Sequence, residues 1–441
     1  MTEYTFGSAP RALPLLGHAS HLLRDPYAFL ASLSQHGDLV RIQLGAHQAI
    51  VVCHPELTHQ LLVDDRTFDK GGPLVDRGRE LFGDSLAICR YAQHRRQRKL
   101  IQPAFHQVRL ADYAATMTAV ISKMTGQWQD GALLDMRAQM RAYTSQVVAT
   151  TMFGGALGAA DRDRALHDLS TLLAGTYIRM FLPKALTRVP TPGNRAYEQA
   201  RVRLRTVLGQ LIDTYRRTGV DHGDALSMLL SAKDENGQQL TSDEIIDQIV
   251  ILFIAGSDTT ANTLSWAVHL LGRHPTAEQR LHEECAEVLH RRPAAFADLD
   301  LLPWTRNIIT ETLRLYPPAA LITRTVTTDT TLGGHRILQG STIIYSSLAV
   351  QHRHDLYPEP EAFAPERWSE PAPHPPRGAL TPFGGGPRIC IGDKFGMTMA
   401  VLGLASIAAN WHLHPHPPQV LPVLRTFLAP RDLRMTVHRR T

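Results

Sequence analysis

The feature that most constrains the fold is a run of about 30 residues that reads as one long helix. Thr241 to Glu244 fit a capping box, in which a hydroxyl and a carboxylate close the first turn, so a helix should begin there. Apolar residues then recur at helical spacing as far as Leu271, and Pro275 predicts the end. At 1.5 Å per residue the helix would be about 45 Å long. A helix of that length that is apolar around its middle is expected to cross the protein interior.

The middle of this helix carries polar residues where the pattern predicts burial. Gly256, Asp258, Thr259 and Thr260 follow the apolar run directly. A buried carboxylate is costly unless it is paired or has a chemical role. The structural alternative is a polar kink, in which threonine hydroxyls bond to carbonyls of the preceding turn. The helix alone leaves both interpretations open.

The rest of the chain predicts a mainly α protein with a minor β portion. The pattern is mostly helical over 112–289, and a last apolar helix is expected over about 392–410. No internal repeat and no separating linker is visible, so a single domain over 1–441 is expected. The strand-like segments are 39–44, 49–53, 325–331 and 342–345.

A second constraint is the segment Phe383-Gly384-Gly385-Gly386-Pro387-Arg388-Ile389-Cys390-Ile391-Gly392. Three consecutive glycines let the backbone turn sharply and approach a flat group closely. Cys390 follows at the mouth of an apolar helix, where backbone N–H groups and the helix dipole favour a thiolate. The structural alternative is a flexible loop before a buried cysteine.

The spacing Phe-x-x-Gly-x-Arg-x-Cys-x-Gly resembles the haem-ligating signature of the cytochrome P-450 family at all five fixed positions. The resemblance implies the P-450 fold, with the long helix over a haem b and the Cys390 thiolate as the iron ligand. A thiolate ligand donates electron density to the iron and favours O–O cleavage. It also implies that Arg388 faces a haem propionate, that Phe383 packs near the sulfur, and that Gly386 and Gly392 belong to the haem-binding loop.

Beside this motif, the segment 255–260 of the long helix matches the family's acid–alcohol segment. The resemblance gives Asp258 and Thr259 catalytic roles, because O–O cleavage needs protons delivered into an otherwise dry pocket. Asp258 would feed the proton relay, and Thr259 would position water or donate a hydrogen bond. Gly256 would leave room for O₂, the co-substrate, or for the substrate.

Glu311 and Arg314 are three residues apart on one predicted helix face and can pair with each other. Taken alone, such a pair usually means a solvated surface. The family has this Glu-x-x-Arg motif, joined by an arginine of a later Pro-Glu-Arg segment, which is Arg367 here. The resemblance implies that the three residues form a buried charged network, which shapes the Cys390 loop and is structural rather than catalytic.

A basic run over 90–101 contains His94 and Arg98, which are four apart and share a helix face. The resemblance assigns both to haem binding, together with Arg324, because burying haem buries two carboxylates that need cationic partners. The other basic side chains are either a solvated face or a surface that steers an acidic electron-transfer partner. Those residues are Arg95, Arg96 and Lys99.

Composition excludes several other classes. A net charge of +5 on 441 residues is too small to imply nucleic acid. The four cysteines form no CxxC pair, which argues against a disulfide scaffold or a cysteine-rich zinc module and favours a reducing compartment. No secretory signal is visible, and the longest apolar run has eight residues, whereas a membrane span needs about 20. We expect a soluble cytoplasmic protein without a membrane anchor.

The expected electron supply is external, because 51 residues after Cys390 leave no room for a fused reductase. The resemblance to soluble bacterial members implies ferredoxin and ferredoxin reductase as donors, and a monomer. The expected substrate is a hydrophobic small molecule, lined by Phe253, Ile254, Ala255, Leu321 and Ile322. Segment 176–183 reads either as a mobile lid or as a plain helix end.

The expected reaction is insertion of one oxygen atom from O₂ into an apolar C–H or C=C bond, in natural-product biosynthesis. The segment 190–195 is similar to bacterial P-450s of terpenoid pathways, while a polyketide or macrocycle is the other expected scaffold. One alternative keeps the haem-thiolate chemistry but ends in desaturation or ring coupling. A haem-thiolate sensor without turnover is an alternative of another class, which Asp258 and Thr259 disfavour because a pure binder needs no proton relay.

Overall fold

The computed structural model describes most of the chain, and its contacts divide that chain into two compact units. The sheet unit consists of Met1–Asp69, Met117–Tyr143 and Thr259–Thr441, and the helical unit of Lys70–Thr116 and Thr144–Asp258. The expectation of one domain over 1–441 stays a prediction. The described residues are 3–45, 47–154, 161, 164–165, 167–169, 171–172, 175, 179, 184–371, 375–416, 420–424 and 426–440.

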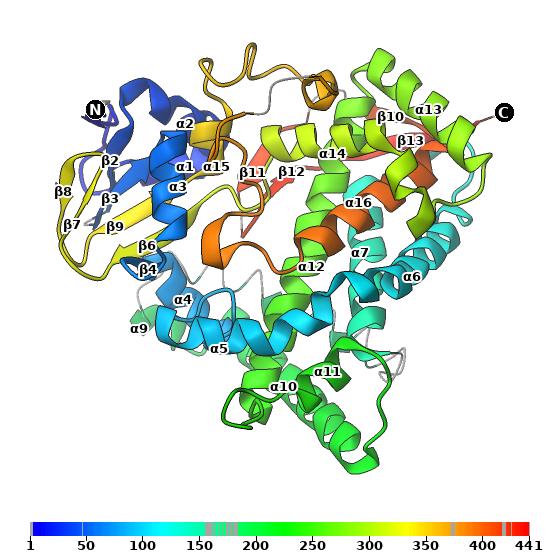
Figure 1. Ribbon diagram of the computed structural model, residues 1–441, viewed down its shortest axis with the longest axis horizontal. Coiled ribbons are helices and arrows are strands. Elements are labelled where there is room, and N and C mark those ends of the chain that lie inside the picture. The colour runs from blue at the N-terminus through cyan, green and yellow to red at the C-terminus, as the bar shows by residue number, and fades with distance from the viewer. Residues whose placement is uncertain are drawn as a thin grey trace. The chain divides into compact units, whose positions relative to one another are not determined.

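A six-stranded sheet in the order β1-β2-β3-β9-β6-β4 organises the first part of the sheet unit (Figure 1). The predicted strand pair is present, since β2 pairs antiparallel with β3. The pairs β1–β2 and β3–β9 are parallel, and β6–β9 is antiparallel. The strands are β1 Phe6–Ser8, β2 Leu39–Leu44, β3 His47–Val52, β4 Phe68–Lys70, β6 Ile322–Val326 and β9 Thr342–Tyr345.

Both faces of this sheet are buried, because neighbouring strand residues alternate between two apolar clusters. Val40, Val51 and Ile344 belong to one cluster, which includes Leu30 of helix α2 (Pro26–Ser32). The residues next to them in the chain, Leu39, Val52 and Ile343, belong to the other cluster, which includes apolar residues of helix α3 (Pro55–Val63). The period of two therefore fixes the register of the sheet.

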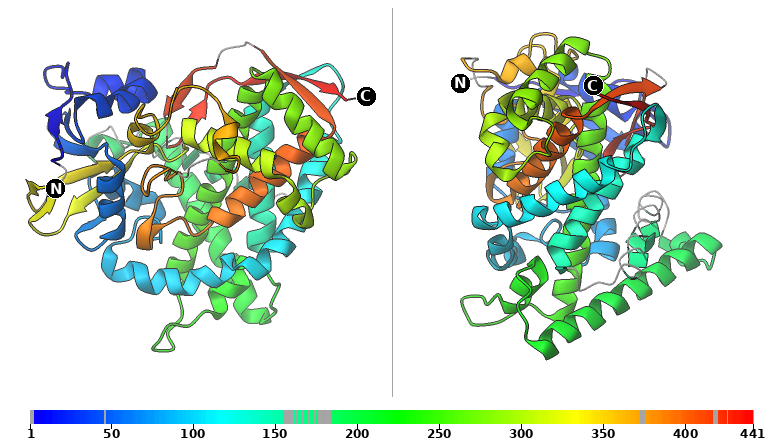
Figure 2. Two further views of the ribbon diagram at one scale, coloured as in Figure 1. Left: turned by 45° about the horizontal axis from the view of Figure 1, so that its top comes forward. Right: turned by 90° about the vertical axis from the view of Figure 1, so that its right-hand side faces the viewer.

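The remaining strands form one three-stranded sheet and two hairpins. The late strands β10 and β13 pair with the early strand β5 in the order β10-β13-β5, and Figure 2 shows the red C-terminal strands side by side. The hairpins are β7–β8 and β11–β12. The bounds are β5 Ala132–Asp135, β7 Thr330–Leu332, β8 His335–Ile337, β10 Trp411–His416, β11 Pro422–Leu424, β12 Leu428–Pro430 and β13 Arg434–Arg439.

Helices cover the sheet unit, and α16 lies beside α13 and α14 (Figures 1 and 2). The predicted last helix is confirmed as α16, which begins one residue after Gly392. The bounds are α1 Ala19–Arg24, α2 Pro26–Ser32, η1 Leu33–His36, α3 Pro55–Val63, α13 Pro275–Leu289, η3 Phe296–Leu301, α14 Pro303–Leu315, α15 Ser347–Gln351, η4 Pro365–Trp368, η5 Gly386–Arg388 and α16 Asp393–Ala408.

The described elements of the helical unit are helices, of which α10 is the longest lying wholly inside it. Thr191 caps the first turn of α10 by accepting a hydrogen bond from the Asn194 N–H, and Gly219, with φ of 63°, ends the helix. The bounds are α4 Pro73–Phe82, α5 Tyr91–Ile101, η2 Gln102–Phe105, α9 Lys184–Thr187, α10 Pro192–Thr218 and α11 Ala225–Ser231. Helices α6 Gln107–Thr125, α7 Met136–Phe153 and α12 Ser242–Leu271 contribute residues to both units.

The predicted long helix is confirmed as α12, which spans 30 residues. Its capping box is present, because the Glu244 N–H donates to Thr241 Oγ1 at 3.2 Å and the Thr241 N–H donates to Glu244 Oε2 at 2.8 Å. Pro275 follows the helix and opens α13. The fold is mainly α with a minor β portion, as expected. Across the described residues, no helix combines the length and apolar character that crossing a membrane requires.

Candidate active site

Cys390 lies in a short loop between η5 and α16. The Cys390 N–H donates to the Phe383 carbonyl at 2.9 Å, which closes the loop. The side chain of Cys390 is exposed, whereas the other three cysteines are buried, as the sequence predicted for packing residues. Phe383 itself is partly buried. The loop therefore presents one thiol at its tip.

Two glycines set the path of this loop. Gly384 and Gly386 adopt positive φ values of 71° and 62°, which glycine tolerates without strain. A Cβ atom on Gly386 would lie 2.1 Å from the carbonyl oxygen of Leu62, in the last turn of α3. Because no larger residue fits there, the loop rests directly on the α3 backbone.

Arg388 points into a small cluster of buried charges rather than toward solvent. Its Nε lies 2.8 Å from Asp65 Oδ2, and its Nη2 lies 2.9 Å from Asp69 Oδ1. The Arg388 side chain is 2% exposed, so both pairs are shielded from water. Sequence reasoning missed both aspartates, since they come more than 300 residues earlier and no motif marks them. The assignment of Arg388 to a haem propionate stays a prediction.

Arg324 is the residue of this cluster whose buried N–H groups are unsatisfied. It lies on β6 and is 2% exposed. Its Nε and Nη1 have no hydrogen-bond partner among the described residues. Burial, together with the nearby Arg388 guanidinium, lowers the pKa of Arg324 to about 10. A cation left in this state is strongly unfavourable unless an anion joins it.

These observations fit a flat cofactor that carries carboxylates and an iron atom. Unpaired guanidinium N–H groups would suit a propionate, and a single exposed thiol would suit an iron ligand. The glycine loop allows close approach of a planar ring. Among the described residues, His, Cys, Asp and Glu side chains form no group of three that could hold a metal ion. The residues present at the Cys390 loop fit haem.

The middle of α12 combines hydroxyl–carbonyl hydrogen bonds with a half-buried acid and a half-buried alcohol. Ser257 Oγ and Thr263 Oγ1 donate to the carbonyls of Phe253 and Thr259, at 2.7 and 3.0 Å, so hydroxyls do bond to the preceding turn. Asp258 and Thr259 are both half-buried. Their catalytic roles stay predictions.

The first residues of α12 within the sheet unit lie beside the Cys390 loop. A Cβ atom on Gly396, in the first turn of α16, would lie 3.6 Å from Thr260 Oγ1 and 4.0 Å from Phe383 Cε1. The small residue at 396 thus lets α16, Phe383 and α12 meet closely. Within the helical unit, Gly256 similarly faces Val148 of α7, at 3.1 Å from the position of a Cβ atom.

The structure brings Glu311, Arg314 and Arg367 together. Arg314 donates hydrogen bonds to both carboxylate oxygens of Glu311, at 2.9 and 2.8 Å, and both side chains are fully buried. Arg367 Nε lies 3.4 Å from Glu311 Oε1. Trp368 Nε1 also donates to Glu311, at 2.9 Å, a contact that sequence reasoning missed although Trp368 adjoins Arg367.

Arg314 also ties the network to the chain that follows α14. Its Nη1 donates to the carbonyls of Gln351 and Pro360, at 3.0 and 2.7 Å, and its Nη2 donates to that of Ala362 at 3.1 Å. Gln351 continues the chain of contacts, because its Oε1 accepts from the Thr381 N–H at 3.1 Å. The network therefore reaches the start of the segment that carries Cys390.

His94 and Arg98 share one face of α5, in the helical unit, and their haem contacts stay predictions. His94 is buried and Arg98 half-buried. Two of the neighbouring basic residues have acidic partners within this unit. Arg96 bonds Asp234 at 2.7 Å and Glu244 at 3.0 Å, and Lys99 forms an exposed pair with Glu235 at 2.6 Å. Arg95 is exposed, and the use of this surface by an electron-transfer partner stays a prediction.

The expected substrate-lining residues are apolar and either buried or half-buried. Phe253 and Ile254 are buried in α12, and Ala255 is half-buried. Leu321 and Ile322 pack against the two apolar clusters of the six-stranded sheet. Their contact with substrate stays a prediction. The expected lid over 176–183 lies outside the described residues, except for residue 179.

Comparison with known proteins finds relatives along the whole chain. The family described as Cytochrome P450 matches residues 8–436. A cyclooctat-9-en-7-ol 5-monooxygenase of Streptomyces melanosporofaciens is 45% identical over 95% of this chain and 92% of its own length. A pentalenene oxygenase of Streptomyces avermitilis is 41% identical over 100% of this chain and 99% of its own.

The fold has a solved counterpart. The crystal structure of the cytochrome P450DA haem domain matches with a TM-score of 0.88 and 23% identity, and it covers 100% of this chain and 99% of that one. At that identity the likeness concerns the fold alone. Together with the family match over residues 8–436, it leaves one conclusion: the chain belongs to the cytochrome P450 family.

Proposed function

We propose that this chain is a haem-thiolate monooxygenase that inserts one oxygen atom of O₂ into a C–H or C=C bond of a terpenoid. The observation that carries the proposal is the exposed Cys390 thiol on a glycine loop, in the same unit as the unsatisfied guanidinium of Arg324. The family is one of monooxygenases that use haem iron, redox partners and hydrophobic substrates. The relatives named for pentalenene and cyclooctat-9-en-7-ol support a terpenoid.

When bound at Cys390, haem b supplies the oxidising chemistry that activates O₂ for oxygen-atom transfer. The absence of a Cys-x-x-Cys-His motif supports haem b over a covalently attached haem. Cys390 would hold the iron through its thiolate, on the loop that contains Phe383, Gly386 and Gly392. Arg324 would donate its Nε–H and Nη1–H to a propionate.

Other chain residues would complete the site. Arg388 would bind a propionate by exchanging an aspartate partner, and sequence resemblance proposes the same role for His94 and Arg98. Phe253, Ile254, Ala255, Leu321 and Ile322 would exclude water and contact the apolar substrate.

Asp258 and Thr259 would manage protons. The Asp258 carboxylate would take up and release a proton, and the Thr259 hydroxyl would hold a water molecule or donate a hydrogen bond. Their half-buried position in α12 supports this role, because the relay must reach solvent at one end.

The proposal extends to the electron donors, the cellular location and the oligomeric state. Ferredoxin and ferredoxin reductase would supply electrons to a monomer, and the net charge of +5 supports both an acidic partner and weak self-association. The four cysteines without a disulfide support a cytoplasmic location. The family match across both units supports a single haem-binding domain.

The central test is the spectrum of the reduced protein with carbon monoxide. A thiolate-bound haem gives a characteristic long-wavelength Soret band, and we expect Cys390→Ala to abolish it. Cys89→Ala, which removes a buried thiol, is the matched control and should keep the band. A normal band in Cys390→Ala would refute the assignment of the iron ligand.

The second test concerns the proton relay. Thr259→Ala should consume reducing equivalents at a similar rate but release most of them as hydrogen peroxide, because substrate oxidation loses its proton supply. Thr263→Ala, one turn later in α12, is the control. Unchanged coupling in Thr259→Ala would argue against the relay.

A third test distinguishes oxygen insertion from desaturation. Product formed from isotopically heavy O₂ would carry one heavy oxygen atom if oxygen is inserted and none if the substrate is desaturated.

A further inference from the structure

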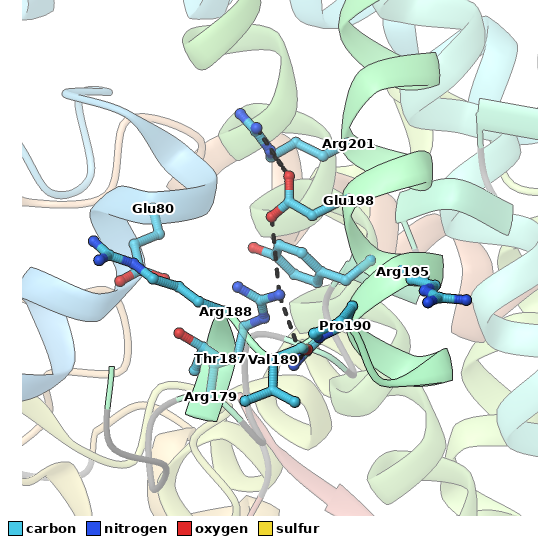
Figure 3. Close-up of a pocket in the computed structure, with 11 residues that line it drawn as sticks. Glu80, Arg179, Thr187, Arg188, Val189, Pro190, Arg195, Glu198 and Arg201 are labelled. Carbon is cyan, nitrogen blue, oxygen red and sulfur yellow. Dashed lines mark hydrogen bonds and ion pairs between the residues drawn. The ribbon is translucent and has the colours of Figure 1, made fainter. Parts of the chain in front are cut away.

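The helical unit contains a pocket of about 620 Å³ beside the start of α10, which goes beyond the proposed haem chemistry (Figure 3). This volume is in the range of small-molecule sites. Residues of α10 and the side chain of Arg179 form one side of the pocket, and Arg188 extends toward the other side, where Glu80 of α4 lies (Figure 3).

The guanidinium of Arg179 lines the pocket and is held in place by its neighbours. It is 8% exposed, although it is an arginine. Its guanidinium carbon lies 3.8 Å from the centre of the Tyr197 ring, and its Nη2 donates to Asn194 Oδ1 at 3.2 Å. A cation stacked on an aromatic ring and held by an amide loses little freedom when a ligand arrives.

The positive charges of the pocket exceed its negative charges. Both carboxylates already have arginine partners: Glu198 pairs with Arg201 at 2.9 Å and lies 3.8 Å from Arg179 Nη2, and Glu80 pairs with Arg77 at 3.2 Å. Arg188 is exposed and has no hydrogen-bond or ion-pair partner in the part of the chain that the structure describes. An anion that enters therefore meets guanidinium groups whose charge the pocket does not balance.

The pocket wall is also apolar in part. Val189 and Pro190 line it next to Arg188, and Tyr197 adds an aromatic ring to the lining. Guanidinium groups bind carboxylates and phosphates through paired N–H donors, while the apolar wall suits hydrocarbon. We propose that this pocket binds an amphipathic anion, which carries one carboxylate or phosphate group on an apolar body.

The experiment uses three probes with the same ten-carbon body: geraniol, geranate and geranyl phosphate. A fluorophore on Leu186→Cys, beside the pocket, reports its occupancy in the ferric haem-loaded protein. The haem absorbance is recorded in parallel and reports any binding at the iron. We expect both anions to bind at the fluorophore at least about tenfold more tightly than geraniol. The tighter of the two identifies the preferred head group.

Arg188→Gln is the test variant and should weaken both anions about tenfold without changing geraniol. Arg195→Gln is the control, because Arg195 borders the pocket but its guanidinium points away from the other labelled side chains (Figure 3). It should change affinity less than twofold. Equal affinity for geraniol and the anions, or equal losses in both variants, would overturn the proposal. Because the readout is local, a failure of the haem assignment would leave this result unaffected.

Discussion

Single residues show the demand for a cofactor most directly. Arg324 is buried without satisfied Nε–H and Nη1–H groups, while Arg388 beside it is paired with Asp65 and Asp69. Burying a cation without a partner costs several kcal/mol, and the pKa of about 10 reflects that cost. The burial of the Arg324 charge is therefore unfavourable in the chain alone, and a bound carboxylate would make it favourable.

Replacing Arg324 should change the stability of the haem-free protein and the retention of haem in opposite directions. We expect Arg324→Met to stabilise the haem-free protein by about 1–3 kcal/mol, because an unsatisfied buried group is removed. The same change should speed the loss of haem, because a propionate loses its donor. Urea unfolding of the haem-free protein and haem transfer to apomyoglobin measure the two effects. Arg336→Met, which changes an exposed arginine paired with Asp329, should alter neither. A less stable haem-free Arg324→Met protein would contradict the expectation.

At the scale of elements, the C-terminal half of the long helix α12 is a structural part of the sheet unit. Its last turns are packed into the sheet unit, where Trp266 stacks on Tyr316 with ring centres 3.9 Å apart. His269 lies one turn later, is 3% exposed, and its Nδ1 has no hydrogen-bond partner among the described residues. Burial, with smaller contributions from Arg273 and His274, lowers the pKa of His269 to about 4.

This lowered pKa predicts acid sensitivity. The unfolded chain binds a proton at His269 below a pH of about 6.5, whereas the folded chain resists it down to about 4, so stability falls as the pH falls between these values. At pH 5 the loss from this residue is about 2 kcal/mol relative to pH 7.5. His269→Leu should remove that part of the loss, as measured by urea unfolding at both pH values. Replacing the exposed His290 by Leu is the control, and an unchanged pH dependence in His269→Leu would exclude the role of His269.

Elements also show how much the sequence could predict. The start of α12 was predictable because the capping box is local, and strands β2, β3 and β9 were predictable because of their short apolar runs, whereas β1 and β4 were not predicted. Glu311, Arg314 and Arg367 could be grouped only through family resemblance, since the arginine at 367 is 56 residues after the glutamate. Asp65 and Asp69 escaped prediction because an ion pair between distant segments leaves no periodic signal. The pairing of Arg96 and Lys99 escaped it for the same reason.

At the scale of the whole molecule, the net charge of +5 concerns association rather than folding. Two side chains of the basic run on α5 pair with acidic residues of the same chain. Arg96 and Lys99 have partners in the loop before α12 and in the first turn of α12. Arg95 lies between these residues and Arg90, and both Arg90 and Arg95 are exposed. An acidic electron donor that docks on α5 would meet these two side chains first.

Electron transfer from an acidic ferredoxin should therefore depend on salt and on Arg95. We expect the second-order reduction rate to fall as ionic strength rises, because screening shortens the reach of surface charges. Arg95→Gln should lower the rate several-fold at low salt with little change in stability. Arg96→Gln should instead reduce stability by about 1 kcal/mol. Stopped-flow reduction measures the rate, and thermal unfolding measures the stability. Equal rates for Arg95→Gln and the unmodified protein at low salt would place the partner elsewhere.

The exposure of Cys390 also matters for making the protein. Burial raises the pKa of the Cys53 and Cys285 thiols to about 12, so these thiols stay protonated and unreactive at neutral pH. Cys390 is the exposed member of the four cysteines, all of which the structure describes. A chain synthesised faster than its host supplies haem thus presents one accessible sulfur, and air oxidation can join two such chains through a disulfide. The haem supply of the expression host then decides the ratio of active enzyme to covalent, reductant-reversible dimer.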